Sequence, residues 1–225
     1  AGLTQLAAEA SKDGDAIRVP NLTLSNPQIS VDANGQYGPG DSAVQASVNF
    51  PNLGDIVPEM SGPGSVDLFA EEVGEIWQVS LDGTGAGVDL SAMAEIADLT
   101  ETPRVDGRVE LTAADLSRFR RLANRDLRGA VDLTAEGSGT VDGSRFDVTA
   151  DVTANRLAVG IPQVDQLLAG RTTLAAVASR DGADAPIRVR TFNLDSPGLD
   201  ASAQGTLLGG NSNLTFNARL ANLGA

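Results

Sequence analysis

Near its start the chain carries residues 2–54, GLTQLAAEASKDGDAIRVPNLTLSNPQISVDANGQYGPGDSAVQASVNFPNLG, and the same pattern returns at residues 170–224, GRTTLAAVASRDGADAPIRVRTFNLDSPGLDASAQGTLLGGNSNLTFNARLANLG. The copies align with a two-residue insertion beside Ala183 and share a Ser-Lys/Arg-Asp-Gly turn and a closing Asn-Leu-Gly. A unit that recurs in this way is typical of an array whose modules bury their faces by stacking on neighbours. We therefore expect function along a surface and not in a pocket.

Period-two alternation of apolar and polar residues dominates the chain. In residues 43–50 one face carries Val44, Ala46 and Val48, and the other carries Gln45 and Ser47. The same register recurs in two further segments, which contribute Phe146, Val148, Ala150 and Val152, and then Leu214, Phe216 and Ala218. Such segments, separated by Gly, Asn, Asp or Pro turns, form antiparallel sheets with one solvent-exposed face. We therefore expect the apolar and polar registers to differ strongly in solvent accessibility. The sequence predicts an all-β chain of roughly a dozen to sixteen strands.

Short helices are expected where the strand pattern is interrupted by an Asp/Asn-Leu-Gly/Ser entry signal. This signal begins at Asn52, Asp89, Asp115 and Asn222, and its Asp or Asn can cap a helix while its Leu packs under the end of the sheet. The strongest of these predictions is a helix over residues 112–124.

Composition excludes several classes of function. The chain of 225 residues has no His and no Cys, which removes the commonest general base and metal ligand, the thiol nucleophile and any disulfide. Its net charge is -14, and a nucleic-acid partner needs a basic surface. The acidity is uneven, because residues 1–100 hold only two basic side chains, Lys12 and Arg18. We expect neither an enzyme nor a nucleic-acid-binding protein.

Local clusters of polar residues give no stronger signal for chemistry. The carboxylates at Glu71, Glu72 and Glu75 lack the spacing of a calcium loop. The Gly-rich strings at Gly83 and Gly137 lack the helix and the Lys of a phosphate-binding loop, so we expect them to be turns between strands. An Arg group at 118, 120, 121, 125 and 128 could hold anionic headgroups, but interleaved Asp residues favour a solvated outer face. No metal, cofactor or catalytic residue is predicted.

The organisation of the chain is read as one continuous β-repeat array over residues 1–225, because no linker or break in composition divides it. It contains no signal peptide and no run of 18 apolar residues, and it starts within the repeat pattern. We expect it to be a segment of a longer protein. A sheet that is apolar on one side must fold over itself, pair with a second sheet or meet a ligand.

The repeats resemble those of the TamB family, the inner-membrane-anchored subunits of the translocation and assembly module of Gram-negative bacteria, and more loosely the AsmA-like group. The resemblance is carried by the strand units DGRVEL at 106–111 and LRGAVDL at 127–133, the segment DLSRFRRLA at 115–123, and repeats that end in Ala-Asn-Leu-Gly. It extends over essentially the whole chain.

The resemblance implies a periplasmic β-taco, an elongated, mainly antiparallel and curled sheet with an apolar interior, within a single-pass inner-membrane protein. It further implies phospholipid transport toward the outer membrane and assembly of outer-membrane proteins with a BamA-like barrel partner, bound through regions outside this chain. Acyl chains would then occupy a groove lined by the ten apolar residues named above, from Val44 to Ala218. The alternative is a structural β-solenoid or sandwich stalk of a secreted adhesin, with a polysaccharide lyase more distant.

Overall fold

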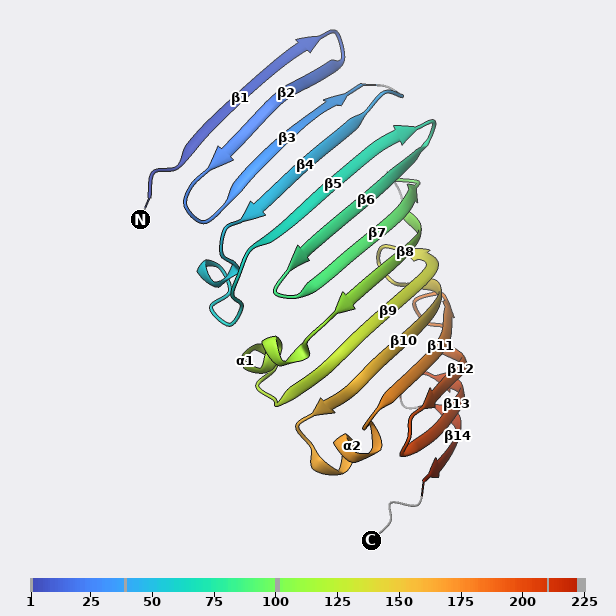
Figure 1. Cartoon of the computed structure of the whole chain (residues 1–225). Coiled ribbons are helices and arrows are strands. Elements are labelled where there is room, and N and C mark those ends of the chain that lie inside the picture. The colour runs from blue at the N-terminus through green and yellow to red at the C-terminus, as the bar shows by residue number, and fades with distance from the viewer. Residues whose placement is uncertain (1, 39, 100–101, 210, 222–225) are drawn as a thin grey trace. The chain divides into compact units, whose positions relative to one another are not determined.

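The computed structural model describes residues 2–38, 40–99, 102–209 and 211–221. Its contacts divide the chain into two units, Ala1–Leu99 (unit 1) and Thr100–Ala225 (unit 2). In each unit the strands follow one another as an antiparallel meander, so that every strand pairs with its neighbours in sequence (Figure 1). The described residues contain fourteen strands, which confirms the predicted all-β, mainly antiparallel fold with a few short helices.

Unit 1 is a seven-stranded sheet. Its strands are β1 (Gln5–Asp13), β2 (Ala16–Ser25), β3 (Ser30–Tyr37), β4 (Ala43–Phe50), β5 (Gly64–Val73), β6 (Ile76–Gly85) and β7 (Val88–Ala97). Tight turns join most of them, and the predicted Asp13-Gly14 turn between β1 and β2 has Gly14 at a φ of 60°, a conformation that glycine adopts without steric cost. A longer connection that contains the 3-10 helix η1 (Leu53–Asp55) joins β4 to β5.

Unit 2 also has seven strands. They are β8 (Arg104–Ala113), β9 (Leu127–Thr140), β10 (Arg145–Val159), β11 (Arg171–Asp181), β12 (Ile187–Asp195), β13 (Leu199–Leu207) and β14 (Asn213–Leu220). Two insertions carry helices: η2 (Leu116–Phe119) with α1 (Arg120–Ala123) follows β8, and α2 (Pro162–Leu167) follows β10. Both insertions lie at the same end of the strands of unit 2 (Figure 1).

The sequence repeat is a repeat of structure. Strands β1 to β4 in unit 1 correspond to β11 to β14 in unit 2, with equivalent pairing: Leu6 faces Leu24 as Leu174 faces Leu194. Each copy also shifts register at the same place, at Pro20 in β2 and at Arg190 in β12. A bulge is where a strand tolerates proline, because the bulged residue need not donate to the ladder. The two copies therefore adopt the same strand pattern.

The helix-entry signals have mixed outcomes. Asn52 and Asp115 cap η1 and η2, accepting hydrogen bonds from the backbone N–H groups of Gly54 (3.2 Å) and Ser117 (2.9 Å). Asp89, in contrast, lies inside β7, because Leu90 continues the apolar register opposite Gly83, so the helix predicted there is wrong. Asn222 lies outside the described residues.

The helix predicted over residues 112–124 is shorter than expected. Thr112 and Ala113 still belong to β8, where Ala113 pairs with Val131, and the helical turns span only Leu116 to Ala123 before Asn124 ends them with a φ of 49°. The pairing of β8 with β9 therefore overrides the helical pattern of the first residues. A single continuous array over residues 1–225 stays a prediction.

Candidate functional site

The alternating register places the apolar candidates of unit 1 on one face of its sheet. On β4, Val44, Ala46 and Val48 lie opposite residues of β3 and β5 that are themselves apolar or glycine. Directly opposed residues of antiparallel strands point to the same side of the sheet, so such pairs extend into rows across the strands. Two of these rows are Leu6-Leu24-Val31-Val48-Val66-Gly83-Leu90 and Ala8-Leu22-Ala33-Ala46-Leu68-Leu81-Ala92. We call the side that carries them the apolar face.

Unit 2 brings its seven candidates together in the same way, on β10 and β14. The rows through them are Gly107-Gly137-Val148-Ala178-Val189-Gly205-Leu214, Val109-Ala135-Ala150-Ala176-Phe192-Ala203-Phe216 and Leu111-Leu133-Val152-Leu174-Leu194-Ala201-Ala218, and Phe146 extends the face beside Val105 and Gly139. Bulky side chains thus alternate with Ala and Gly along the apolar face of unit 2. Its chemistry is that of a hydrocarbon surface.

The apolar face is not sealed from water in either unit. Val148, Ala150 and Val152 are half-buried, whereas Val44, Leu214 and Ala218 are exposed. The expectation that the apolar and polar registers differ strongly in accessibility is therefore not met, since Gln45 is exposed like Val44 and Thr149 is half-buried like Val148. The reason is that, among the described residues of each unit, the strands contact their neighbours in the meander and no second layer of the same unit packs across the face.

The helical insertions close one end of the strands. A Cβ on Gly64 or Gly85 would come within about 3 Å of the Leu53 side chain, at 3.0 and 2.8 Å, so these strand glycines leave the room in which Leu53 packs over the sheet end. In unit 2 the hydroxyl of Ser196 donates to the carbonyl of Leu167 in α2 at 2.7 Å. The apolar face of unit 1 is thus bounded by the packed side chain of Leu53, as predicted, and in unit 2 the backbone of α2 is held against the turn at Ser196.

The opposite side of the unit 1 sheet is acidic. The row that crosses it is Thr23-Asp32-Ser47-Asp67-Asp82-Ser91, in which Asp67 and Asp82 are exposed and directly opposed. Like charges in that position are unfavourable, and no ion pair relieves them in the described part of unit 1. Within the same described residues no group of three or more Asp or Glu is arranged to hold a metal ion. This row is solvated and acidic, and the neighbouring row on the same side carries the exposed side chains of Phe69 and Met93.

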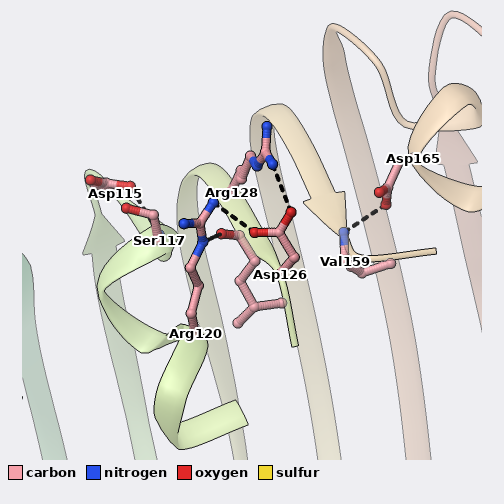
Figure 2. A network of polar contacts seen from close by, with 8 residues as sticks. Asp115, Ser117, Arg120, Asp126, Arg128, Val159 and Asp165 are labelled. Atoms are coloured by element: carbon pink, nitrogen blue, oxygen red, sulfur yellow. Dashed lines mark hydrogen bonds and ion pairs between the residues drawn. The ribbon is translucent and has the colours of Figure 1, made fainter. Parts of the chain in front are cut away.

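The Arg group of unit 2 is partly neutralised. Arg120 and Arg128 both bind Asp126, at 2.6 and 2.7 Å, and Arg120 also donates to the carbonyl of Leu127 at 3.2 Å (Figure 2). The hydrogen bond from Arg128 and the charge of Arg120 hold the pKa of Asp126 below its ordinary value. The hydrogen bonds from Ser117 lower the pKa of Asp115 in the same region. These contacts link α1 to the start of β9. Because Arg120 and Arg128 both pair with Asp126, neither is free to bind an anionic headgroup without giving up that partner.

Sequence reasoning missed a pair of equivalent depressions on the polar side, one in each copy of the repeat. The depression in unit 1 has a volume of about 330 Å³ and includes Arg18, Asn34 and Gln36 among its lining residues. The one in unit 2, of about 510 Å³, is lined at the matching positions by Arg188, Gln204 and Thr206. Both lie beside the register shift of β2 and β12, which only the pairing of strands reveals.

In the part of the chain that the structure describes, no helix is long and apolar enough to cross a membrane. Comparison of the chain with family models, with curated proteins and with solved structures found no match in any of the three.

Proposed function

We propose that this chain is a segment of a TamB-like protein of the periplasm, anchored in the inner membrane, and that its apolar face carries phospholipid acyl chains. In this proposal the longer protein moves phospholipid toward the outer membrane and supports assembly of outer-membrane proteins with a BamA-like barrel, through regions outside these residues. The proposed role requires no catalytic residue and no cofactor.

One observation carries the proposal: the two rows of unit 1 and the three rows of unit 2 listed above run from strand to strand without a polar residue, and parts of them are exposed to solvent. An acyl chain gains about 0.8 kcal/mol for each CH₂ that it removes from water against such a surface. Rows of Val, Leu and Ala offer shape but no polar partner, which suits a ligand that is recognised by its hydrocarbon. A secreted stalk, the alternative role, would gain nothing from leaving this face open.

The acidic side of unit 1 is consistent with this role. The apolar and acidic registers lie on opposite sides of the same strands, so acyl chains on the apolar face avoid the carboxylates of Asp67 and Asp82. The carboxylates of the acidic side would repel anionic headgroups, so lipid should not bind there.

The experiment uses a phospholipid with a photoactivatable group near the end of one acyl chain. After illumination with the purified, delipidated chain, peptide mass spectrometry locates the adducts. We expect adducts on the apolar register of β10, at Val148 and Val152, and few at Asp147 or Asp151 on the same strand. The alternating residues serve as the internal control. Adducts spread equally over both registers, or the absence of saturable labelling, would overturn the proposal and favour a structural stalk.

A further inference from the structure

The depression of unit 1 is lined by a basic residue and by no acidic one, although unit 1 is strongly acidic. Residues 1–99 contain fifteen Asp and Glu residues and two basic residues, of which Arg18 lines the depression. The Arg18 side chain is exposed, and it forms no ion pair among the residues that the structure describes. Its guanidinium group can therefore receive an anionic ligand.

The repeat indicates which anion suits a guanidinium group at this place. In unit 2 the matching residue, Arg188, pairs with the carboxylate of Asp181 at 3.3 Å. Asp13 matches Asp181 in unit 1, but within the described residues it forms no ion pair with Arg18. The carboxylate that the chain itself supplies in unit 2 is thus left for a ligand to supply in unit 1.

Two rows of side chains cross strands β2 to β5 in this depression, on the polar side of the sheet. The rows are Arg18-Gln36-Ala43 and Asn34-Gln45-Phe69. The amide of Gln36 is already engaged, because it donates to Asp41 at 2.8 Å. The exposed amides of Asn34 and Gln45 therefore lie beside the hollow as hydrogen-bonding groups, and Phe69, which is 40% exposed, adds an apolar wall.

We propose that this depression binds a small organic acid that carries a carboxylate, an amide and an apolar ring in that order. The carboxylate pairs with Arg18, whose planar guanidinium group matches it with two hydrogen bonds. The amide meets Asn34 and Gln45, and the ring packs against Phe69. The volume of about 330 Å³ is at the lower end of the range of small-molecule sites, about 300–1,000 Å³. The depression lies on the side of the sheet opposite the apolar face, so the proposal is independent of the lipid role.

The order of the three groups follows from the charges around the depression. The acidic row with Asp32 and Asp67 lies next to the row of Asn34 and Phe69, and the row of Arg18 is one step farther away. Glu71 continues the row of Arg18, but three strands away. That separation is about 14 Å at the usual strand spacing, beyond the Debye length of about 8 Å at physiological ionic strength. The ligand's carboxylate therefore belongs at Arg18 and its uncharged ring at Phe69.

The experiment uses N-benzoylglycine, which has a ring, an amide and a carboxylate in line, as the probe. Proton–nitrogen correlation NMR of the unmodified chain follows the side-chain amide signals of Asn34 and Gln45, and we expect both to shift saturably. N-benzoylglycinamide, which lacks the charge, should bind about tenfold more weakly or worse, because it loses hydrogen bonds to a charged group. N-acetylglycine, which lacks the ring, should also bind more weakly.

Two variants locate the charge. Arg18→Gln should raise the dissociation constant of N-benzoylglycine about tenfold. The matched control, Arg188→Gln, makes the same change at the equivalent exposed position of unit 2 and should leave binding unchanged. The absence of a saturable shift, equal binding of N-benzoylglycinamide, or equal effects of the two variants would each overturn the proposal. The same spectra check the fold of each variant, and the comparison of probes on the unmodified chain decides the question without any variant.

Discussion

A single carboxylate placed on the apolar face should separate lipid binding from folding, and β14 offers a matched pair of positions. Ala218 lies on the apolar face and Asn217 on the polar side of the same strand, and both are exposed. Ala218→Asp therefore adds its charge where the carboxylate stays hydrated in the lipid-free chain. Exposed substitutions of this kind change the free energy of unfolding by about 0.5 kcal/mol or less.

Lipid binding should respond very differently. To lie over Ala218→Asp an acyl chain must strip water from the carboxylate, which costs several kcal/mol, or else avoid the position. Avoiding it and giving up two CH₂ contacts costs about 1.6 kcal/mol, which corresponds to a more than tenfold rise in the dissociation constant. Asn217→Asp, with the same charge on the other side of the sheet, should leave lipid binding nearly unchanged.

The assay is equilibrium binding of a fluorescent-acyl phospholipid to both variants and to the unmodified chain, with urea unfolding as the check on stability. Because an Asp side chain is ordinarily neutral below a pH of about 3.9, acidification should restore binding to Ala218→Asp. Equal dissociation constants for the two variants would show that the side of the sheet on which the charge lies does not control lipid binding. If Ala218→Asp loses no more stability than Asn217→Asp and binds the lipid as tightly as the unmodified chain, acyl chains do not lie over Ala218.

Three further predictions concern the fold. Gly137→Ala should lower the free energy of unfolding by about 1–3 kcal/mol in urea titrations, because its Cβ would approach the Cα of Val148 at 2.8 Å, whereas Gly182→Ala, with open space around it, should have little effect. Asn52→Ala should cost about 1 kcal/mol through the lost cap, and Asp89→Ala, with the same sequence signal but in a strand, should cost less; equal losses would contradict the cap. Because the pKa of Asp126 is depressed in the folded chain, its stabilising contribution is present above the unfolded pKa of about 3.9 and is lost as pH falls through the folded value. Asp126→Asn should therefore show a shallower loss of stability on acidification than the unmodified chain, with Asp106→Asn as the control, and an unchanged slope would contradict the ion-pair assignment.

Much of the fold could be predicted because the alternation of Val44, Ala46 and Val48 is a local property of the chain, and the register then follows from which side is apolar. The signal at Asp89 shows the limit of local reasoning, because a capping residue and a following Leu are equally compatible with a strand once β6 supplies a partner opposite Leu90. The helix α2 was not predicted, because a helix of six residues is too short to show a helical period of apolar residues. Only Pro162 at its first position indicates a helix start.

The sequence predicts which face of the sheet carries the candidate residues, because the side is set by the alternation. It does not predict their solvent exposure, because exposure depends on whether another layer covers the sheet. Edge position also escapes sequence reasoning: Leu6 and Leu174 are equivalent in the repeat, and only the neighbouring strand β10 makes Leu174 half-buried. The strand glycines of Gly137-Ser-Gly139, predicted as turn residues, lie within β9, where close approach to the backbone of β10 requires them.

Trp77, the single tryptophan of the chain, can report whether acyl chains lie on the apolar face. Trp77 belongs to the apolar register of β6, opposite Glu72 and Ile96 and two residues from Val79, and it is half-buried. Phospholipid brominated along its acyl chains should quench Trp77 fluorescence saturably, while the same lipid without bromine should not. Saturable lipid binding without quenching of Trp77, or no binding at all, would show that acyl chains do not lie on this face.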